Sequence, residues 1–241
     1  MSLPTRRFAR CLVHALALLS GVFLAGLTLA DTIAIIGTGR VAGALGPQFA
    51  KQGHTIVYGS REPEREEVAA LVARTGGSAS ASAQAEAAAG ADIVVIAVPG
   101  AVAEEVVRGL GDLSGKIILD PTNRTEAAAD GLRVHGVATS NAELIQAAAP
   151  GARVVKAFNT LNFRTMETPE ISGGPVTIPI VGDDTEAKRK IAALAEGMGF
   201  EAMDLGPLRY ANTLEEMLVI WVNARSMGTP YDYYFRRQAT E

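Results

Sequence analysis

A glycine-rich turn between two short apolar runs carries the residues whose types and spacing could do chemistry. The turn, Gly37-Thr38-Gly39-Arg40-Val41-Ala42, has the spacing G-x-G-x-x-A and follows the apolar run Ile33–Ile36. Gly37 permits a tight turn, Gly39 lets backbone N–H groups approach a pyrophosphate, and Ala42 lets the following helix pack closely on the strand. The positive end of that helix faces the phosphates. The pattern therefore predicts a dinucleotide-binding turn.

The end of the second apolar run, Thr55–Tyr58, indicates which nucleotide would bind. An NAD site usually places Asp or Glu about 20 residues past the glycines, where it holds the ribose 2′-OH. Here the chain reads Gly59-Ser60-Arg61. A hydroxyl and a guanidinium suit a 2′-phosphate, and no carboxylate stands there to repel it. The sequence predicts NADP(H), held at its 2′-phosphate by Ser60, Arg61 and, one helical turn further, Arg65.

Length and composition fit one such domain, which we place at residues 31–241. The chain has 241 residues, 48% of them hydrophobic, and a formal net charge of −4, so a nucleic-acid partner is not suggested. The single cysteine, Cys11, lies in the N-terminal segment, and His54 and His135 form no cluster, so no metal site is expected. We expect His54 at a turn and His135 in a loop or at a strand edge.

The N-terminal 30 residues resemble a secretory signal peptide. Arg6, Arg7 and Arg10 precede an almost wholly apolar stretch, and Thr28-Leu29-Ala30 offers small residues at the cleavage positions. We therefore expect residues 1–30 to be a signal peptide and the protein to be periplasmic or secreted. Two alternatives stay open: the segment could remain as a membrane anchor, since about 20 apolar residues span a bilayer, or the start codon could be misassigned in a cytoplasmic protein.

Strand and helix patterns alternate along the rest of the chain. The continuous apolar run at 93–98 is typical of a buried parallel strand. Further strands are expected at 116–120, 153–158, 176–181 and 200–204, with a short edge strand at 78–82. Helices are expected at 62–74, 83–89, 102–110, 140–150, 185–197 and 208–227, the fourth of them opened by the capping box Ser140-Asn141-Ala142-Glu143. The alternation predicts an α/β, Rossmann-type, doubly wound and mostly parallel sheet, with helices on both faces and a closing C-terminal helix.

Several motifs resemble those of the coenzyme F420-dependent NADP oxidoreductase family. They are Gly37-Thr38-Gly39, Gly59-Ser60-Arg61, Asp120-Pro121-Thr122-Asn123, Val154-Val155-Lys156-Ala157-Phe158-Asn159-Thr160 and Gly182-Asp183-Asp184. The chain is also similar to the related reductase domain of the STEAP metalloreductases, which share the Lys-Ala-Phe-Asn-Thr run and Ser140-Asn141-Ala142-Glu143. The resemblance covers about residues 32–220.

The resemblance implies hydride transfer between NADPH and a deazaflavin or flavin, with coenzyme F420, FMN or FAD as the second substrate. By position it implies that the pyrophosphate lies against Thr38, Gly39, Arg40 and Val41, and that Val98 and Ala157 lie near the nicotinamide and its ribose. The expected cofactor-binding residues are thus Gly37, Thr38, Gly39, Arg40, Val41, Ser60, Arg61, Arg65, Val98 and Ala157.

No side chain is assigned as catalytic, because the chain after residue 30 shows no acid–base dyad, nucleophile elbow or metal cluster. Hydride transfer between two rings needs none of these. Asn123 and Asn159 could orient the nicotinamide carboxamide or the acceptor ring, or could satisfy turn backbone groups. Lys156 could donate a proton, but its place in a strand favours a structural role. Met217 and Trp221, four apart on a helix, favour core or dimer packing over ring stacking.

Two other functions stay open. A small imine or hydroxyacid reductase would need an additional helical dimerisation domain, and only one long helix and a tail follow Asp204. A non-catalytic NADP-binding sensor, or a partner subunit of a membrane reductase, would bind NADPH tightly but turn over no acceptor. The expected partner is a small-molecule redox acceptor, a homodimer is an open alternative, and membrane contact is expected only if the N-terminal segment is retained.

Overall fold

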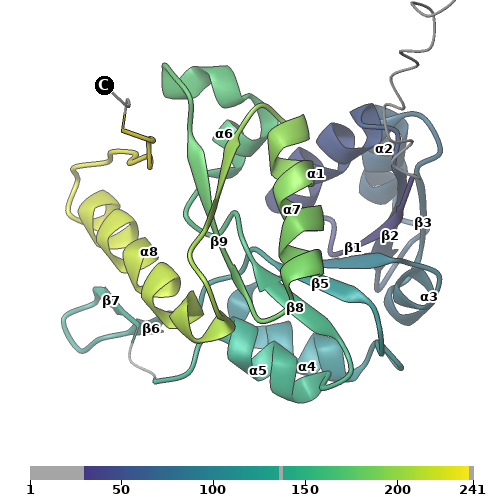
Figure 1. The fold of residues 1–241 in the computed structure, drawn as a ribbon, viewed down its shortest axis with the longest axis horizontal. Coiled ribbons are helices and arrows are strands. Elements are labelled where there is room, and N and C mark those ends of the chain that lie inside the picture. Colours follow the sequence, from purple (N-terminus) through teal and green to yellow (C-terminus); the bar gives the residue numbers. More distant parts are fainter. Residues whose placement is uncertain (1–29, 136–137, 239–241) are drawn as a thin grey trace, which may run out of the picture.

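The computed structural model describes residues 30–135 and 138–238 and has an eight-stranded sheet at its centre (Figure 1). The strand order is β10-β9-β8-β5-β4-β1-β2-β3, and β9 is antiparallel to β8 while all other neighbours are parallel. Read from β3, the order 3-2-1-4-5 is that of the Rossmann fold. The expected α/β, mostly parallel fold is therefore confirmed. The expected signal peptide lies outside the described residues, Ala30 excepted.

The strands are short and alternate with helices in the first half of the sheet. Its members are β1 (Thr32–Ile36), β2 (Thr55–Ser60), β3 (Ser80–Ala83), β4 (Ile93–Ile96), β5 (Ile117–Asp120), β8 (Arg153–Lys156), β9 (Thr177–Gly182) and β10 (Glu201–Asp204). A separate antiparallel ribbon pairs β6 (Glu126–Ala127) with β7 (Arg133–Val134). In the described part of the chain, no helix is both long and apolar enough to cross a membrane.

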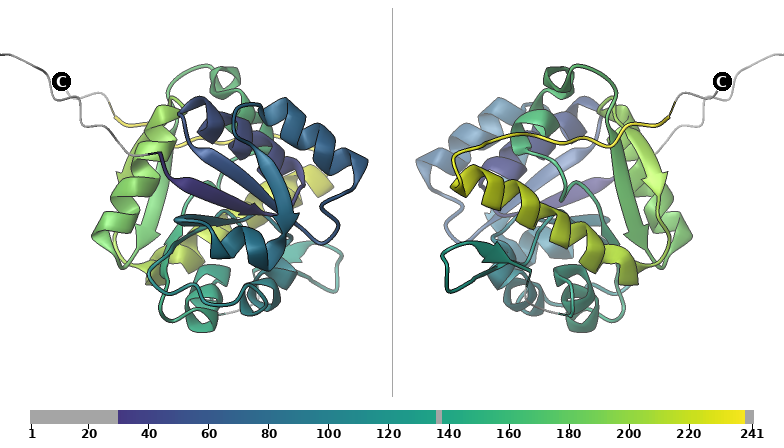
Figure 2. Two further views of the ribbon diagram at one scale, coloured as in Figure 1. Left: turned by 90° about the vertical axis from the view of Figure 1, so that its right-hand side faces the viewer. Right: turned by 90° about the vertical axis from the view of Figure 1, so that its left-hand side faces the viewer.

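Helices cover both faces of the sheet (Figure 2). One face packs against α1 (Arg40–Lys51), α2 (Glu66–Thr75), α6 (Phe163–Glu167) and α7 (Thr185–Gly197). The other packs against α3 (Gln84–Ala89), α4 (Ala103–Arg108), α5 (Asn141–Ala148) and the start of α8 (Ala211–Ser226). Three single turns, η1 (Gly100–Val102), η2 (Pro169–Ser172) and η3 (Leu208–Tyr210), complete the set.

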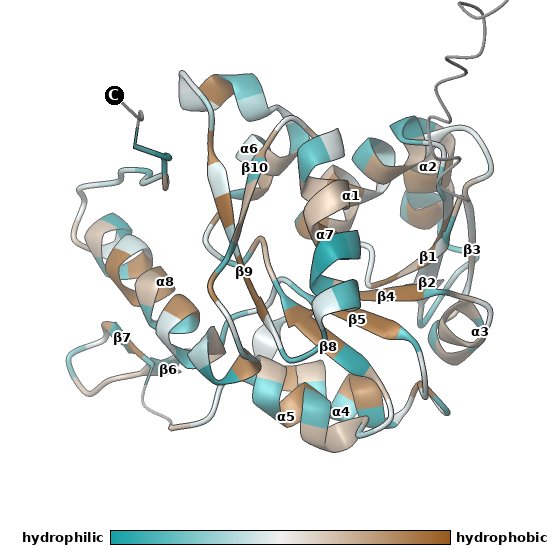
Figure 3. Ribbon diagram, viewed as in Figure 1, coloured by the Kyte–Doolittle hydropathy of each residue, from teal (hydrophilic) through white to brown (hydrophobic). Residues whose placement is uncertain are grey.

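The two hydrophobic cores follow from the alternation of side chains along each strand. Ile33 and Ile35 of β1 belong to one core, whereas Ala34 and Ile36 belong to the other, because successive side chains point to opposite faces. Strands buried on both faces are therefore apolar at most positions. Figure 3 shows this concentration of apolar residues on the central strands, while the helices mix apolar and polar positions.

Two boundaries that differ from the sequence expectation have a local cause. Helix α2 begins at Glu66 rather than at residue 62, because the Ser60 hydroxyl accepts a hydrogen bond from the Glu62 N–H at 3.1 Å and holds a turn there. Strand β8 ends at Lys156 rather than at residue 158, because Phe158 has a φ of +66°, which a strand cannot contain. Both of these boundaries lie at the carboxyl ends of strands, where the candidate site forms.

Candidate functional site

A cleft of about 670 Å³ opens at the carboxyl ends of β1, β2 and β4. This volume falls within the roughly 300–1,000 Å³ typical of small-molecule pockets. Its lining brings together most of the expected cofactor-binding residues: Gly37, Thr38, Gly39, Ser60, Arg61, Arg65 and Val98. The position is the one where open α/β sheets bind dinucleotides.

A second hollow of about 280 Å³ continues from this cleft. The two share Gly39, Ala97, Val98 and Pro99, and the second also contains the expected residues Arg40 and Val41 together with Pro121 and Thr122. The expected contact of Ala157 is not supported, because its side chain is fully buried in the core and lines neither hollow. The combined surface therefore runs from Arg65 at one end to Thr122 at the other.

The two glycines of the turn are required for different reasons. Gly37 has a φ of +115°, and a Cβ there would lie 2.4 Å from the carbonyl oxygen of Ala97, so the protein itself needs glycine. At Gly39 a Cβ would meet no atom within 4 Å. The space beside Gly39 is therefore open, as the approach of a pyrophosphate to the start of α1 requires.

Exposed cations mark the Arg65 end of the cleft. The Arg65 guanidinium lies 3.9 Å from the Glu62 carboxylate and 3.4 Å from that of Glu67, and all three side chains are more than half exposed. Arg61 is also exposed, whereas Ser60 is mostly buried. Because exposed ion pairs contribute little energy, both guanidinium groups can turn toward a bound phosphate.

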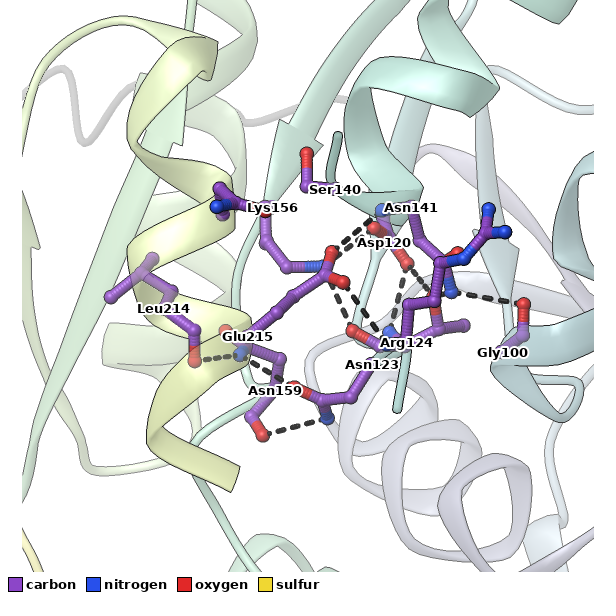
Figure 4. A network of polar contacts seen from close by, with 12 residues as sticks. Gly100, Asp120, Asn123, Arg124, Ser140, Asn141, Lys156, Asn159, Leu214 and Glu215 are labelled. Carbon is purple, nitrogen blue, oxygen red and sulfur yellow. Dashed lines mark hydrogen bonds and ion pairs between the residues drawn. The ribbon is translucent and has the colours of Figure 1, made fainter. Parts of the chain in front are cut away.

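The Thr122 end of the surface rests on a buried ionic cluster of Lys156, Asp120 and Glu215 (Figure 4). The Lys156 ammonium donates to Asp120 at 2.7 Å and to the Thr122 carbonyl at 2.8 Å, and it lies 2.8 Å from Glu215. All three charged side chains are fully buried. Since the three N–H bonds of the ammonium already have acceptors, Lys156 has none left for a ligand, which confirms the structural interpretation.

The Glu215 carboxylate also binds the loop after β5 and the first residue of α5. One oxygen accepts the backbone N–H of Asn141 at 2.9 Å and the other that of Arg124 at 3.0 Å. Burial raises the pKa of Glu215; Lys156 opposes this shift and the charge of Asp120 adds to it. Burial therefore outweighs the attraction of Lys156, and the second carboxylate of the cluster acts in the same direction as burial.

The remaining candidates have structural partners. The amide of Asn123 donates to the Asn159 backbone carbonyl, and the amide of Asn159 donates to Asn123 Oδ1, both at 3.0 Å, so the two side chains bind each other's segments. Trp221 donates to Asp232 at 3.0 Å, and Met217 packs against the second core. His135 is buried at the end of β7, where its Nδ1 lies 2.8 Å from the Arg124 carbonyl oxygen.

Sequence reasoning missed Glu215, whose carboxylate links α8 to the site. The signal was present: Ala211, Leu214, Glu215 and Leu218 have the spacing of one helical face, so a carboxylate occupies a position where burial is expected. The described residues contain no group of three or more potential metal ligands.

Comparisons with known proteins agree with this geometry. Residues 32–124 match the family model described as NADP oxidoreductase, coenzyme F420-dependent. The F420-dependent NADP reductase of Methanothermobacter thermautotrophicus is 28% identical over 206 residues, which are 79% of this chain and 88% of that protein. A crystal structure of a protein assigned as an F420-dependent NADP reductase from Arthrobacter sp. FB24 is 29% identical, with a TM-score of 0.77 over 86% of this chain and 100% of the other.

Metalloreductase STEAP3 of Rattus norvegicus is 31% identical over 186 residues, which are 77% of this chain but 36% of that protein. The chain thus spans about a third of the length of the curated metalloreductases it matches. The fold and the cleft place the chain in the Rossmann class, and these relatives make it similar to NADP-dependent oxidoreductases. Its match to the model of the coenzyme F420-dependent NADP oxidoreductase family lies in residues 32–124, which contain β1 to β5 of the sheet.

Proposed function

We propose that the protein transfers a hydride between NADPH and a deazaflavin-type acceptor such as coenzyme F420. The observation that carries the proposal is the continuous surface from Arg61 and Arg65, past Gly39, to Thr122. It offers cations at one end, an open approach to the backbone in the middle and a rigidly held loop at the other. This order matches the 2′-phosphate, pyrophosphate and nicotinamide of NADPH. The F420-dependent relatives support this acceptor, and FMN and FAD are kept as alternatives.

The chemistry belongs to the two ring systems, and the chain supplies binding and orientation. NADPH, when bound, gives up one hydride with its two electrons, and the oxidised acceptor takes that hydride together with one proton from solvent. Ser60, Arg61 and Arg65 would bind the 2′-phosphate, and the turn at Gly39 would hold the pyrophosphate. Val98 and Thr122 would then fix the distance and angle of the nicotinamide.

A second candidate is a partner subunit that passes electrons from NADPH to a separate membrane reductase. The match to one third of a metalloreductase favours it, since that relative contains much more than the matched part. The two candidates differ in one respect: only the first predicts turnover with a free acceptor.

The test uses purified protein under anaerobic conditions. NADPH and NADH are titrated separately, and then oxidised coenzyme F420, FMN or FAD is mixed with the NADPH-loaded protein while nicotinamide absorbance is followed. Preferential binding of NADPH and its oxidation by F420 would support the proposal. Tight binding without oxidation by any of the three would favour the partner-subunit candidate, and absence of NADPH binding would refute both.

Localisation is a separate proposal, which the N-terminal pattern of Arg6, Arg7 and Arg10 before an apolar stretch supports. We propose that residues 1–30 direct export and that the protein acts outside the cytoplasm. Intact-mass measurement of the protein from fractionated cells tests this. A periplasmic species beginning at Asp31 is expected, whereas a full-length cytoplasmic species would contradict it.

A further inference from the structure

The Thr122 end of the surface depends on a side chain that lies almost a hundred residues away in the sequence. Thr122 lines the second hollow, and its hydroxyl donates to Asp120 Oδ1 at 2.6 Å while its N–H donates to the same oxygen at 2.8 Å. Its carbonyl accepts from Lys156. The Asn141 amide, at 2.9 Å, donates to the Thr122 hydroxyl. Every polar group of Thr122 is therefore used to hold it in place.

The groups that hold Thr122 are in turn held by Glu215. Lys156 and the backbone of Asn141 both contact its Oε1 atom, and Arg124, two residues beyond Thr122, donates to Oε2. The Asn141 amide also donates to the Gly100 carbonyl at 3.0 Å, at the start of the turn that follows Pro99. One carboxylate on α8 thus anchors the loop after Thr122 and the start of α5, whose Asn141 side chain contacts Thr122 and Gly100 (Figure 4).

Such a cluster could serve only to stabilise the fold, but its composition favours a positioning role. Two carboxylates and one ammonium share a fully buried space, and burial raises the pKa of Glu215. A buried ion pair is no more stabilising than apolar residues of similar volume, and fixed geometry is its best-supported benefit. The geometry that it fixes here is that of Thr122, which faces the hollow.

We infer that Glu215 is a positioning residue for the nicotinamide half of NADPH, acting through Lys156, Asn141 and Arg124 on the loop that carries Thr122. This inference rests on the proposed function, since it assigns the hollow beside Thr122 to the nicotinamide. Glu215 itself lines neither hollow and touches no cofactor. The adenosine half lies at the opposite end, against residues that the cluster does not contact.

The test compares two ligands that differ by the nicotinamide half. NADPH and adenosine 2′,5′-bisphosphate are titrated into wild-type protein, Glu215→Gln and the control Glu216→Gln, which changes an exposed neighbour on the same helix. Glutamine keeps the volume of Glu215 but can accept with only one of its two terminal atoms. The backbone N–H of either Arg124 or Asn141 therefore loses its acceptor. We expect NADPH affinity to fall about tenfold in Glu215→Gln, as for one lost hydrogen bond to a charged group.

Adenosine 2′,5′-bisphosphate should bind Glu215→Gln with affinity within about twofold of wild type, and Glu216→Gln should match wild type for both ligands. Equal weakening of both ligands, or no change in either, would overturn the inference. If Glu215→Gln does not fold, Glu215→Asp is the second variant: it keeps the negative charge near Lys156 but is too short to reach the backbone N–H groups of both Arg124 and Asn141. The same difference between the two ligands is then expected. Failure of wild type to bind either ligand would instead refute the proposed function, and the inference with it.

Discussion

The two ends of the proposed NADPH surface are built in opposite ways. At the Arg65 end the two guanidinium groups, of Arg61 and Arg65, are exposed, lie within six consecutive residues from Ser60, and the ion pairs of Arg65 are weak surface pairs. At the Thr122 end they are buried and satisfied, and they come from β5, β8, α5 and α8. The first end is arranged to bind a charge, and the second to hold a shape.

This difference separates specificity from positioning. A 2′-phosphate brings its own charge, so flexible guanidinium groups can close on it at little cost. A ring that gives up a hydride must instead be held at a fixed distance and angle, which rigid and fully hydrogen-bonded walls provide. Substitutions at the two ends should therefore have different consequences.

The largest effect is expected at the buried end. Lys156→Met removes the ammonium from between Asp120 and Glu215 and leaves two buried carboxylates without a counter-charge. We expect the free energy of unfolding to fall by about 3–5 kcal/mol, measured by urea denaturation. The control is Lys188→Met, which breaks the partly exposed pair with Asp204 and should cost less than about 1 kcal/mol. Similar losses of unfolding free energy in both variants would contradict the proposed difference between the buried cluster and a surface ion pair.

The middle of the surface should show a loss of binding without a loss of fold. Gly39→Val places a side chain in open space where the pyrophosphate would lie, so we expect NADPH affinity to fall by at least about a hundredfold, or 2.8 kcal/mol. Thermal stability should change little. Gly37→Ala is the contrasting variant, since its Cβ would clash with the Ala97 carbonyl and destabilise the fold itself. Unchanged NADPH affinity in Gly39→Val would refute the glycine-loop assignment.

The exposed end should show selectivity. Arg61→Ala is expected to weaken NADPH binding by about 1.5–3 kcal/mol, the value of one hydrogen bond between charged groups, and to leave NADH binding nearly unchanged. Isothermal titration with both nucleotides measures the difference. If both nucleotides weakened equally, Arg61 would not contact the 2′-phosphate.

The smallest effect is a pH dependence at the buried end. Because burial raises the pKa of Glu215, the folded protein holds that proton more tightly than the unfolded chain. The stability that this residue contributes is then fully present below its ordinary pKa of about 4.5 and is lost as pH rises through the raised value. The difference in unfolding free energy between wild type and Glu215→Gln should shrink as pH rises from about 4 to 7. A difference that grew with pH would mean that the pKa is lowered.

Sequence reasoning succeeded where structure is set locally. The G-x-G-x-x-A turn, the capping box at Ser140 and the apolar strands each depend on neighbouring residues, and all three form as expected. The Ser140 hydroxyl accepts the Glu143 N–H at 3.2 Å, and the Glu143 carboxylate accepts the Ser140 N–H at 2.9 Å. Such patterns carry their own hydrogen-bond partners within one turn of helix.

The missed features depend on contacts between distant segments. Lys156 could be read from the sequence as a strand residue, but its partners Asp120 and Glu215 lie 36 and 59 residues away and meet it only in the folded sheet. Ala157 was expected beside the nicotinamide, but Phe158 takes a left-handed conformation and Ala157 is buried in the core. Neither the register of β8 nor the approach of α8 is encoded in a local pattern.

Hydride transfer is tested most directly by mixing NADPH-loaded protein with oxidised coenzyme F420 in the absence of oxygen. The loss of nicotinamide and deazaflavin absorbance is followed over one turnover, with Arg61→Ala and Glu215→Gln in parallel. We expect both absorbances to fall together, because each NADPH transfers one hydride to one acceptor molecule. We also expect saturating NADPH to restore the rate of Arg61→Ala but not that of Glu215→Gln. Bound NADPH that stays reduced in the wild-type protein, whatever its affinity, would contradict the proposed hydride transfer to F420.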